Sequence, residues 1–142
     1  MSYLFRQKLV FDPVAFSGQS LPVSLVYVVE PEEALLDLYC KYLLKEKFAV
    51  KGFRGLDMLV VPKHPEPEPD VAVVNSHLLR HPEFTRVREK VFPEKIKIIS
   101  IGSAPGQDFV QSLMSMGVSS HLERRLSRPG DLVEIVRALL YH

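Results

Sequence analysis

Residues 23–36 read VSLVYVVEPEEALL and indicate the fold of the chain. The first half of this stretch, residues 23–29, is almost wholly apolar, as in strands that a parallel sheet buries on both faces. Pro31, Glu32 and Glu33 then suit the first turn of a helix, where proline loses no intrahelical hydrogen bond and carboxylates lie near the positive end of the helix dipole. The stretch therefore predicts a buried strand that leads into a helix. The apolar stripe of that helix consists of Leu35, Leu36, Cys40, Leu43 and Leu44.

The same alternation of apolar strand and amphipathic helix continues along the rest of the chain. It is typical of a parallel sheet with right-handed crossovers and helices on both faces. Five strand–helix units in 121 residues (142 less the first 21) match the size of a flavodoxin-like domain. The predicted fold class is α/β, with a doubly wound, five-stranded parallel sheet. Further strands are expected over residues 48–53, 70–74, 96–101 and 118–122, and further helices over 56–61, 84–92, 108–116 and 132–140.

Composition and charge restrict the class of protein. The 142 residues suit one domain, and 18 Lys and Arg against 17 Asp and Glu give a formal charge of +1, which argues against a nucleic-acid partner. Cys40 is the single cysteine, so an internal disulfide framework and a cysteine-based zinc site are excluded. No apolar run approaches the roughly 20 residues of a membrane span, and the N-terminus shows no clean signal peptide. We therefore expect a cytoplasmic protein with no membrane association.

Residues 1–21 are expected to form a segment of their own, ahead of a domain over residues 22–142. Residues 3–11 have the composition of one short strand, which an Asp-Pro pair ends, and residues 17–20 are typical of a flexible connector. Two interpretations stay open. The segment is either an arm that pairs with a partner or with a second copy of the chain, or an edge strand or tail. The first interpretation makes a homodimer a candidate assembly.

Three stretches give the chain a resemblance to a known family. Residues 28–36 (VVEPEEALL) resemble the opening of bacterial response-regulator receiver domains, and residues 69–75 (PDVAVVN) lie where receivers have their phosphoacceptor strand. Residues 117–140 match the last strand and helix of the family. The resemblance covers roughly residues 22–142 and implies a receiver-like fold, whose functional side chains stand at the carboxyl ends of the strands.

The resemblance also implies a vestigial acidic pocket. Receivers hold a magnesium ion with two acidic residues after the first strand; here Glu30 fills the first position and Pro31 the second, with Glu32 as a partial substitute. The residue at the phosphoacceptor position is Asn75 rather than aspartate. A carboxylate attacks a phosphoryl group to form an acyl phosphate, whereas a neutral amide does not. We therefore predict no aspartyl phosphorylation, no metal site and no other cofactor.

The family's hydroxyl position at the end of the fourth strand is filled by Ser100. Because this hydroxyl contacts the phosphoryl group in receivers, Ser100 is identified as a vestigial phosphate-contact residue. Ser103 is the alternative if the register slides. The residue after the hydroxyl is usually small in the family, and Ile101 is expected to crowd the entrance instead.

Two further family positions lie around the fifth strand. Arg124 aligns with the phosphate-binding lysine, and the replacement is not conservative because a guanidinium differs from an ammonium in geometry. An alternative role for Arg124 is an ion pair with Glu30 that stabilises an unphosphorylated pocket. His121 aligns with the switch aromatic residue of the family. It is interpreted either as a titrating switch or as a polar residue at a strand end.

These changes predict a non-phosphorylatable receiver-like signalling module of bacterial two-component signal transduction, which is not an enzyme and has no catalytic residue. It is expected to act through protein–protein interaction with another signalling protein. The surface expected to bind that partner is the last strand with its flanking helices, residues 108–116 and 131–141. Met114 and Met116 are candidate contact residues there, although we expect at least one of them in the core.

A second function class uses the same crevice. In this alternative the chain is a small-molecule- or anion-binding flavodoxin-like domain, and Glu30, Ser100 and Arg124 bind the ligand. No set of nucleophile, base and orienting residue can be read from the sequence, which disfavours an enzyme.

Two local features are expected to be structural. His77 and His81 have the i, i+4 spacing of helical metal ligands, but Pro82 disfavours helix at His81 and no third ligand is evident nearby in the sequence. We therefore expect a pair of exposed histidines in a loop. Residues 64–69 (HPEPEP) force an extended backbone and are interpreted as a stiff connector, the other interpretation being a docking strap for a partner.

Overall fold

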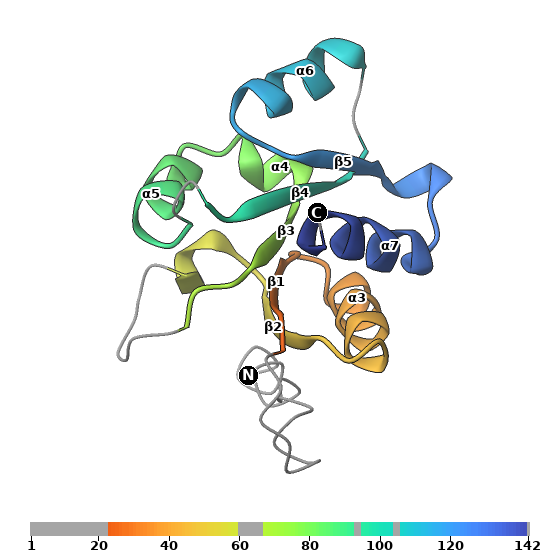
Figure 1. The fold of residues 1–142 in the computed structure, drawn as a ribbon. Helices are drawn as coiled ribbons and strands as arrows, with labels where there is room; N and C mark the ends of the chain where they lie inside the picture. The colour runs from red at the N-terminus through yellow and green to blue at the C-terminus, as the bar shows by residue number, and fades with distance from the viewer. Residues whose placement is uncertain (1–22, 60–66, 93–94, 104–105, 142) are drawn as a thin grey trace.

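A computed structural model describes residues 23–59, 67–92, 95–103 and 106–141, and the predicted N-terminal segment lies outside these ranges. Five strands alternate with helices along the chain (Figure 1). The strands are β1 (Leu25–Val29), β2 (Ala49–Phe53), β3 (Val71–Asn75), β4 (Lys97–Gly102) and β5 (Ser120–Glu123). The helices are α3 (Glu33–Lys45), α4 (Ser76–Leu79), α5 (Glu83–Lys90), α6 (Gln107–Ser115) and α7 (Pro129–Leu140), with 3-10 helices η1 (Leu56–Leu59) and η2 (Arg124–Leu126). Within the described ranges, no helix has the length and apolar character that crossing a bilayer requires.

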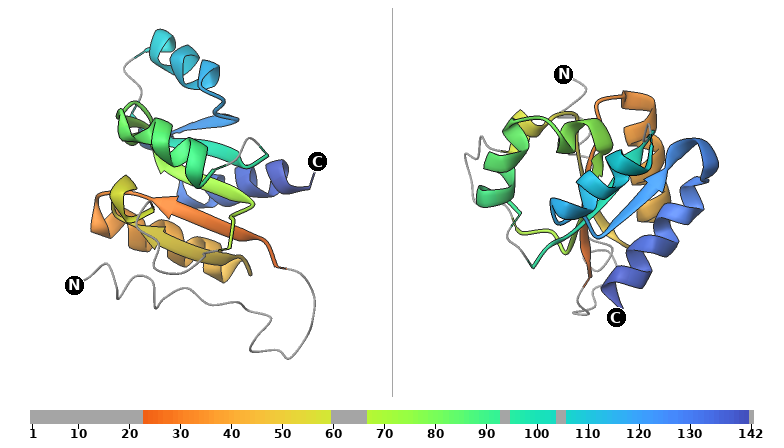
Figure 2. Two further views of the ribbon diagram at one scale, coloured as in Figure 1. Left: turned by 90° about the vertical axis from the view of Figure 1, so that its left-hand side faces the viewer. Right: turned by 90° about the horizontal axis from the view of Figure 1, so that it is seen from above.

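The five strands form one parallel sheet with the order β2-β1-β3-β4-β5. Helices α3 and α7 pack on one face, and α4, α5 and α6 pack on the other, so the sheet lies between two helix layers (Figure 2). The strand order reverses between β1 and β3, which places a crevice at the carboxyl ends of these two strands. The predicted fold class, a doubly wound five-stranded parallel sheet, is confirmed.

Each face of the sheet buries its own hydrophobic core. Successive side chains of a strand point to opposite faces, so Tyr27 and Val29 pack beneath α4, α5 and α6 while Val26 and Val28 pack beneath α3 and α7. All residues of the central strand β3 are buried. Burial on both faces is the physical reason why the strands appear in the sequence as unbroken apolar runs.

The short helices show the limits of the sequence pattern. The helix predicted over residues 56–61 is the 3-10 helix η1, which ends at Leu59, and residues 60 and 61 lie outside the described ranges. The pattern does not predict α4 or η2, because helices of 4 and 3 residues are too short to show a periodicity. The longer helices and all five strands begin and end within a few residues of their expected positions.

Both Met114 and Met116 are partly exposed, so the expectation that at least one of them lies in the core is wrong. The buried residues of α6 are Phe109 and Leu113. Consecutive helical residues are rotated by about 100°, so the residue after Leu113 leaves the buried stripe. Met116 follows the last residue of the helix, where the chain turns toward β5.

The described part of the proline-rich connector is tied to the body of the domain. The Tyr27 hydroxyl donates a hydrogen bond to the Pro67 carbonyl oxygen at 2.7 Å, and Lys95 Nζ lies 3.0 Å from a carboxylate oxygen of Glu68. These contacts favour the interpretation as a connector. His64 and the residues up to 66 lie outside the described ranges.

Candidate functional site

The carboxyl ends of the strands bring together polar residues that the sequence singles out. Glu30 directly follows β1, Asn75 ends β3 and Arg124 follows β5. Parallel strands all end at the same edge of their sheet, so these side chains meet although 94 positions separate Glu30 from Arg124. The place where they meet is the crevice at which doubly wound folds bind ligands.

Glu30 is the centre of a closed set of hydrogen bonds. Its side chain is only 2% exposed. Oε1 accepts from Arg124 Nη2 at 2.7 Å and from Asn75 Nδ2 at 3.1 Å. Oε2 accepts from the backbone N–H of Glu32 at 2.9 Å. A buried charge is tolerated when it is paired and hydrogen-bonded in this way, and the ion pair proposed for Arg124 from the sequence is present.

Asn75 has a structural role besides its contact with Glu30. Its Oδ1 accepts the backbone N–H of His77 at 2.9 Å, so the side chain caps the first turn of α4. Asparagine is a preferred N-cap residue because its short side chain satisfies a backbone donor that has no partner within the helix. The cap fixes the amide with its oxygen on α4 and its nitrogen on Glu30. Both polar ends of Asn75 are thus engaged within the protein.

The two positions after Glu30 contribute backbone groups to the site. The Pro31 carbonyl oxygen accepts from Arg54 Nε at 3.1 Å and from Arg54 Nη2 at 3.0 Å. Glu32 is an exposed residue that donates its backbone N–H to Glu30. Among the residues that the structure describes, no cluster of three or more His, Cys, Asp or Glu side chains has the arrangement of a metal site.

Tyr39 of α3 extends the network beyond Arg124. Burial raises the pKa of the Tyr39 phenol above its ordinary value of 10.0, and a hydrogen bond from Arg124 together with the guanidinium charge opposes that rise. The hydroxyl is therefore protonated near neutral pH. Sequence reasoning missed Tyr39, because an aromatic residue in an apolar helix gives no sign of a polar contact.

Alkaline titration is expected to destabilise the fold through Tyr39. A group whose pKa is raised in the folded state stabilises the protein below its unfolded value, here 10.0, and this contribution is lost as the pH rises through the folded value. We expect the free energy of unfolding to fall above about pH 10, and to fall less steeply in Tyr39→Phe. Urea unfolding of both proteins between about pH 8 and about pH 11 measures the difference. The same pH dependence in both proteins contradicts the assignment.

A second set of hydrogen bonds joins β4 to β5. Ser100 and His121 are register partners, and Ser100 Oγ lies 2.9 Å from His121 Nδ1. His121 Nε2 lies 3.4 Å from Glu123 Oε1, and Arg125 Nε donates to Glu123 Oε2 at 3.4 Å. The contacts run from the sheet interior to the surface. Ser103, the alternative to Ser100, is an exposed residue that follows β4.

Serine, histidine and a carboxylate in this order have the composition of a hydrolytic triad, but Ser100 is completely buried. A substrate therefore has no access to its hydroxyl, and we interpret the set as a bridge between β4 and β5. Sequence reasoning missed Glu123 as the partner of His121. The signal that was available is the period of two along a strand, which puts these two side chains on one face.

Ile101 lies on the other face of the sheet from Ser100, because neighbouring residues of a strand alternate. It packs with Leu122 and Leu132 in the core beneath α3 and α7. Its side chain borders a small cleft beside Arg124.

The two histidines with metal-ligand spacing have separate structural contacts. The ring of His77 packs edge-on against Phe109, with 6.2 Å between the ring centroids. His81 Nδ1 accepts the backbone N–H of Glu83 at 3.1 Å, at the start of α5. Both residues are exposed, as expected, but His77 lies in α4 and not in a loop.

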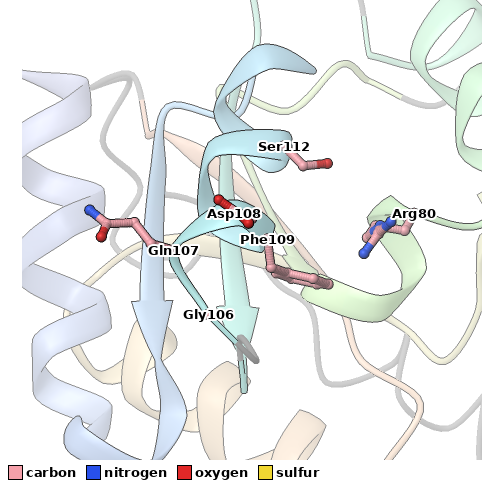
Figure 3. A pocket seen from close by; sticks show the side chains of 6 residues that line it. All are labelled: Arg80, Gly106, Gln107, Asp108, Phe109 and Ser112. Carbon is pink, nitrogen blue, oxygen red and sulfur yellow. The ribbon is translucent and has the colours of Figure 1, made fainter.

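A cavity of about 500 Å³ lies between the end of α4 and the start of α6 (Figure 3). Its volume is in the range of small-molecule sites. Its aromatic wall is covered, because the Arg80 guanidinium lies 5.0 Å from the centre of the Phe109 ring. Figure 3 shows Gln107 pointing away from Arg80, so the polar groups of the lining do not converge. The cavity contains none of the site residues predicted from the sequence; its other lining residues are Gly106, Asp108 and Ser112.

Comparison with known proteins concerns the fold. No protein-family model and no curated protein sequence matches the chain. Among solved structures, the chain is similar to the BeF3-activated receiver domain of DrrB, with a TM-score of 0.69 and 14% identity over 85% of this chain and 100% of that one. It is similar to the chemotaxis response regulator CheY4 of Vibrio cholerae, with a TM-score of 0.70 and 12% identity over 83% and 99%. It is also similar to the signal receiver domain of an HD domain-containing protein from Pseudomonas fluorescens, with a TM-score of 0.68 and 16% identity over 85% and 97%.

The chain therefore has the flavodoxin-like fold of response-regulator receiver domains. Identities of 12% to 16% make this similarity one of fold, so the function of each site residue is judged from its own contacts.

Proposed function

We propose that this chain is a non-phosphorylatable receiver-like module of bacterial two-component signalling that acts in the cytoplasm by binding another protein. The observation that carries the proposal is the bonding of Glu30 to Arg124 and Asn75. By the sequence resemblance, Arg124 and Asn75 align with the lysine and the aspartate of a phosphorylatable receiver. The crevice is thus filled by contacts within the chain.

With Asn75 at the phosphoacceptor position, the chain lacks the carboxylate that is the nucleophile of the family's reaction. A carboxylate attacks phosphorus because it carries a negative charge and an available lone pair, and it then forms an acyl phosphate. An amide is neutral, and its nitrogen lone pair is delocalised into the carbonyl group. In this chain the amide oxygen also accepts the His77 N–H. These properties support the absence of aspartyl phosphorylation.

Arg124 alters the charge balance that a magnesium ion needs. Mg²⁺ takes oxygen ligands and is typically held by one or two carboxylates together with phosphate and water. Here the Glu30 carboxylate is paired with a guanidinium, and the second acidic position of the family is Pro31. A divalent cation has to displace Arg124 before it reaches Glu30. The proposed module therefore works without the metal and without the phosphoryl group.

The anion-binding alternative uses the same residues and is not favoured by their contacts. Glu30 and Arg124 bond to one another, and Ser100 bonds to His121. A ligand entering the crevice has to break these bonds before it makes its own.

Recognition of another signalling protein is the proposed activity. The proposed surface is β5 with α6 and α7, where Met114 and Met116 are partly exposed and flexible thioether side chains adapt to a partner. A homodimer formed through residues 1–21 is a second assembly within the same proposal. It is tested by comparing the solution mass of the full chain with that of a chain lacking residues 1–20, and an unchanged oligomeric state removes it.

Asn75→Asp is expected to stay unphosphorylated by acetyl phosphate and Mg²⁺, because Pro31 and Arg124 are unchanged. The new carboxylate replaces a donor to Glu30 by a like charge, which is expected to lower the free energy of unfolding by about 2 kcal/mol. Intact-mass spectrometry measures the first effect and urea unfolding the second. The control variant combines Asn75→Asp with Pro31→Asp and Arg124→Lys, which restores the family's residues at all three positions. A robust phosphoryl adduct on the single variant contradicts this account of the pocket.

Amide NMR spectra of the unchanged chain test the proposed function directly. On addition of Mg²⁺ and then of beryllofluoride, a phosphoryl mimic, the signals of Glu30, Asn75 and Ser100 are expected to keep their positions. Saturable shifts at these residues show that the crevice still binds phosphoryl-like ligands and contradict the proposal. For the binding activity, affinity capture with the folded chain is compared with capture by a variant carrying Met114→Glu on the proposed surface. Absence of any specific partner of the unchanged chain contradicts this part.

A further inference from the structure

A small cleft opens between α3 and the turn that joins β5 to α7. Helices α3 and α7 lie side by side in Figure 1. Its volume is about 160 Å³. Four aliphatic side chains form its walls, and two guanidinium groups border it. The aliphatic residues are Leu35, Leu38, Ile101 and Leu122, and the basic residues are Arg124 and Arg128.

The volume restricts what the cleft can hold. Sites for drug-sized molecules and cofactors measure roughly 300–1,000 Å³. A cleft of about 160 Å³ admits one compact apolar group. An apolar side chain that fills a fitted pocket can serve as the anchor of a protein interface.

The charges at the border of the cleft restrict its ligand further. Arg124 Nη2 is bonded to Glu30, and the Arg124 side chain as a whole is 28% exposed. The Arg128 side chain forms no ion pair within the described part of the chain. A carboxylate is the acceptor that guanidinium groups bind best.

We infer that the cleft binds the C-terminal residue of a partner protein, with an aliphatic side chain inside and the terminal carboxylate on Arg124 and Arg128. The apolar walls and both guanidinium groups border one small volume, so the ligand carries its carboxylate close to its apolar group. A chain-terminal residue does so, because both groups are attached to the same Cα. This inference rests on the proposed function and adds the chemistry by which the partner is recognised.

Two small probes test the cleft in the full chain. N-acetyl-leucine has the proposed side chain and carboxylate, and N-acetyl-leucinamide has the same side chain without the charge. In amide NMR titrations, the acid is expected to shift Leu38, Leu122 and Arg128 saturably, and the amide to bind about tenfold more weakly. Arg128→Gln is expected to weaken the binding of N-acetyl-leucine about fivefold or more. The matched control is Arg125→Gln, which removes an exposed arginine that is paired with Glu123 and does not line the cleft.

The inference is overturned by equal binding of acid and amide, by the absence of a saturable shift at the cleft, or by the same effect of Arg125→Gln and Arg128→Gln. A third probe, acetyl-Ala-Ala-Leu, identifies the source of the carboxylate. A protein terminus continues out of the cleft, so this peptide is expected to bind at least as well as N-acetyl-leucine. A cleft that excludes the peptide and holds only the free acid contradicts a protein partner.

The failure of this inference is distinguishable from failure of the proposed function. Leu38→Glu places a carboxylate on the wall of the cleft at a partly exposed helical position. If the unchanged chain captures a partner and Leu38→Glu captures it equally, only the cleft is wrong. If the unchanged chain captures no partner, the proposed function fails as well.

Discussion

Replacing Arg124 by methionine is expected to lower the free energy of unfolding by about 3 kcal/mol, because it leaves the buried Glu30 carboxylate without its counter-charge. Glu30 keeps two donors, Asn75 Nδ2 and the Glu32 N–H, which do not neutralise it. The Arg124 side chain is 28% exposed and Glu30 is 2% exposed. Most of the lost free energy is therefore expected to come from the unpaired charge of Glu30. Urea unfolding at neutral pH measures the change.

The matched control for Arg124→Met is Arg125→Met. Arg125 pairs with Glu123 at 3.4 Å, but its side chain is 73% exposed, and exposed ion pairs contribute about 0–1 kcal/mol. Adding Glu30→Gln to Arg124→Met removes the isolated charge and is expected to restore part of the loss. If Arg124→Met costs no more than Arg125→Met, the bonding of Glu30 is not a stabilising feature of the crevice.

Gly102→Ala is the second substitution with a large expected effect, again about 3 kcal/mol of destabilisation. Gly102 ends β4 with a φ of +151°, a conformation that residues with a Cβ rarely adopt. A Cβ at this position lies 2.4 Å from Ser76 Oγ, which is fully buried where α4 packs on β4. Backbone strain and steric overlap therefore add to one another.

Two variants separate the strain from the overlap. Gly130→Ala is the matched control, since a Cβ there meets no atom within 4 Å, and a change of less than about 1 kcal/mol is expected. Ser76→Ala removes a buried hydroxyl that has no partner among the described residues, so by itself it is expected to leave stability unchanged or raised. When Ser76→Ala is combined with Gly102→Ala, it is expected to recover only the stability that the steric overlap costs, and not the part lost to backbone strain. Equal losses in Gly102→Ala and in Gly130→Ala contradict the steric argument.

The fold and the contact between Glu30 and Arg124 could be predicted from the sequence. The fold follows from the local pattern of apolar residues, and the contact follows from the shared edge of parallel strands. Buried apolar runs alternating with helical stripes are sufficient to predict five parallel strands. The carboxyl ends of such strands share an edge, and for that reason Glu30 and Arg124 are identifiable as partners without knowledge of any distance. Charge and topology together restrict an arginine at this edge to few partners.

The remaining contacts depend on register and on loop geometry, which the pattern of residue types does not contain. The bond between Ser100 and His121 exists because β4 and β5 pair in one register, and a shift by one residue turns His121 to the other face. The N-cap of Asn75 requires a helix of 4 residues, too short for a periodic signal. The expectation that at least one of Met114 and Met116 lies in the core rests on the apolar character of methionine, whereas the rotation of α6 turns Met114 away from the buried stripe.

The closed bonding of Glu30 has a consequence for how such a module is regulated under the proposed function. A phosphorylatable receiver changes its output at a fixed number of molecules per cell, because covalent chemistry shifts each molecule between two states. In the proposed module the polar groups of the crevice bond to one another, so phosphorylation does not shift it between two states. Occupancy of the partner then follows mass action, set by the amounts of the two proteins and their dissociation constant. The dose of this chain, controlled by synthesis and degradation, takes the place of its chemical modification.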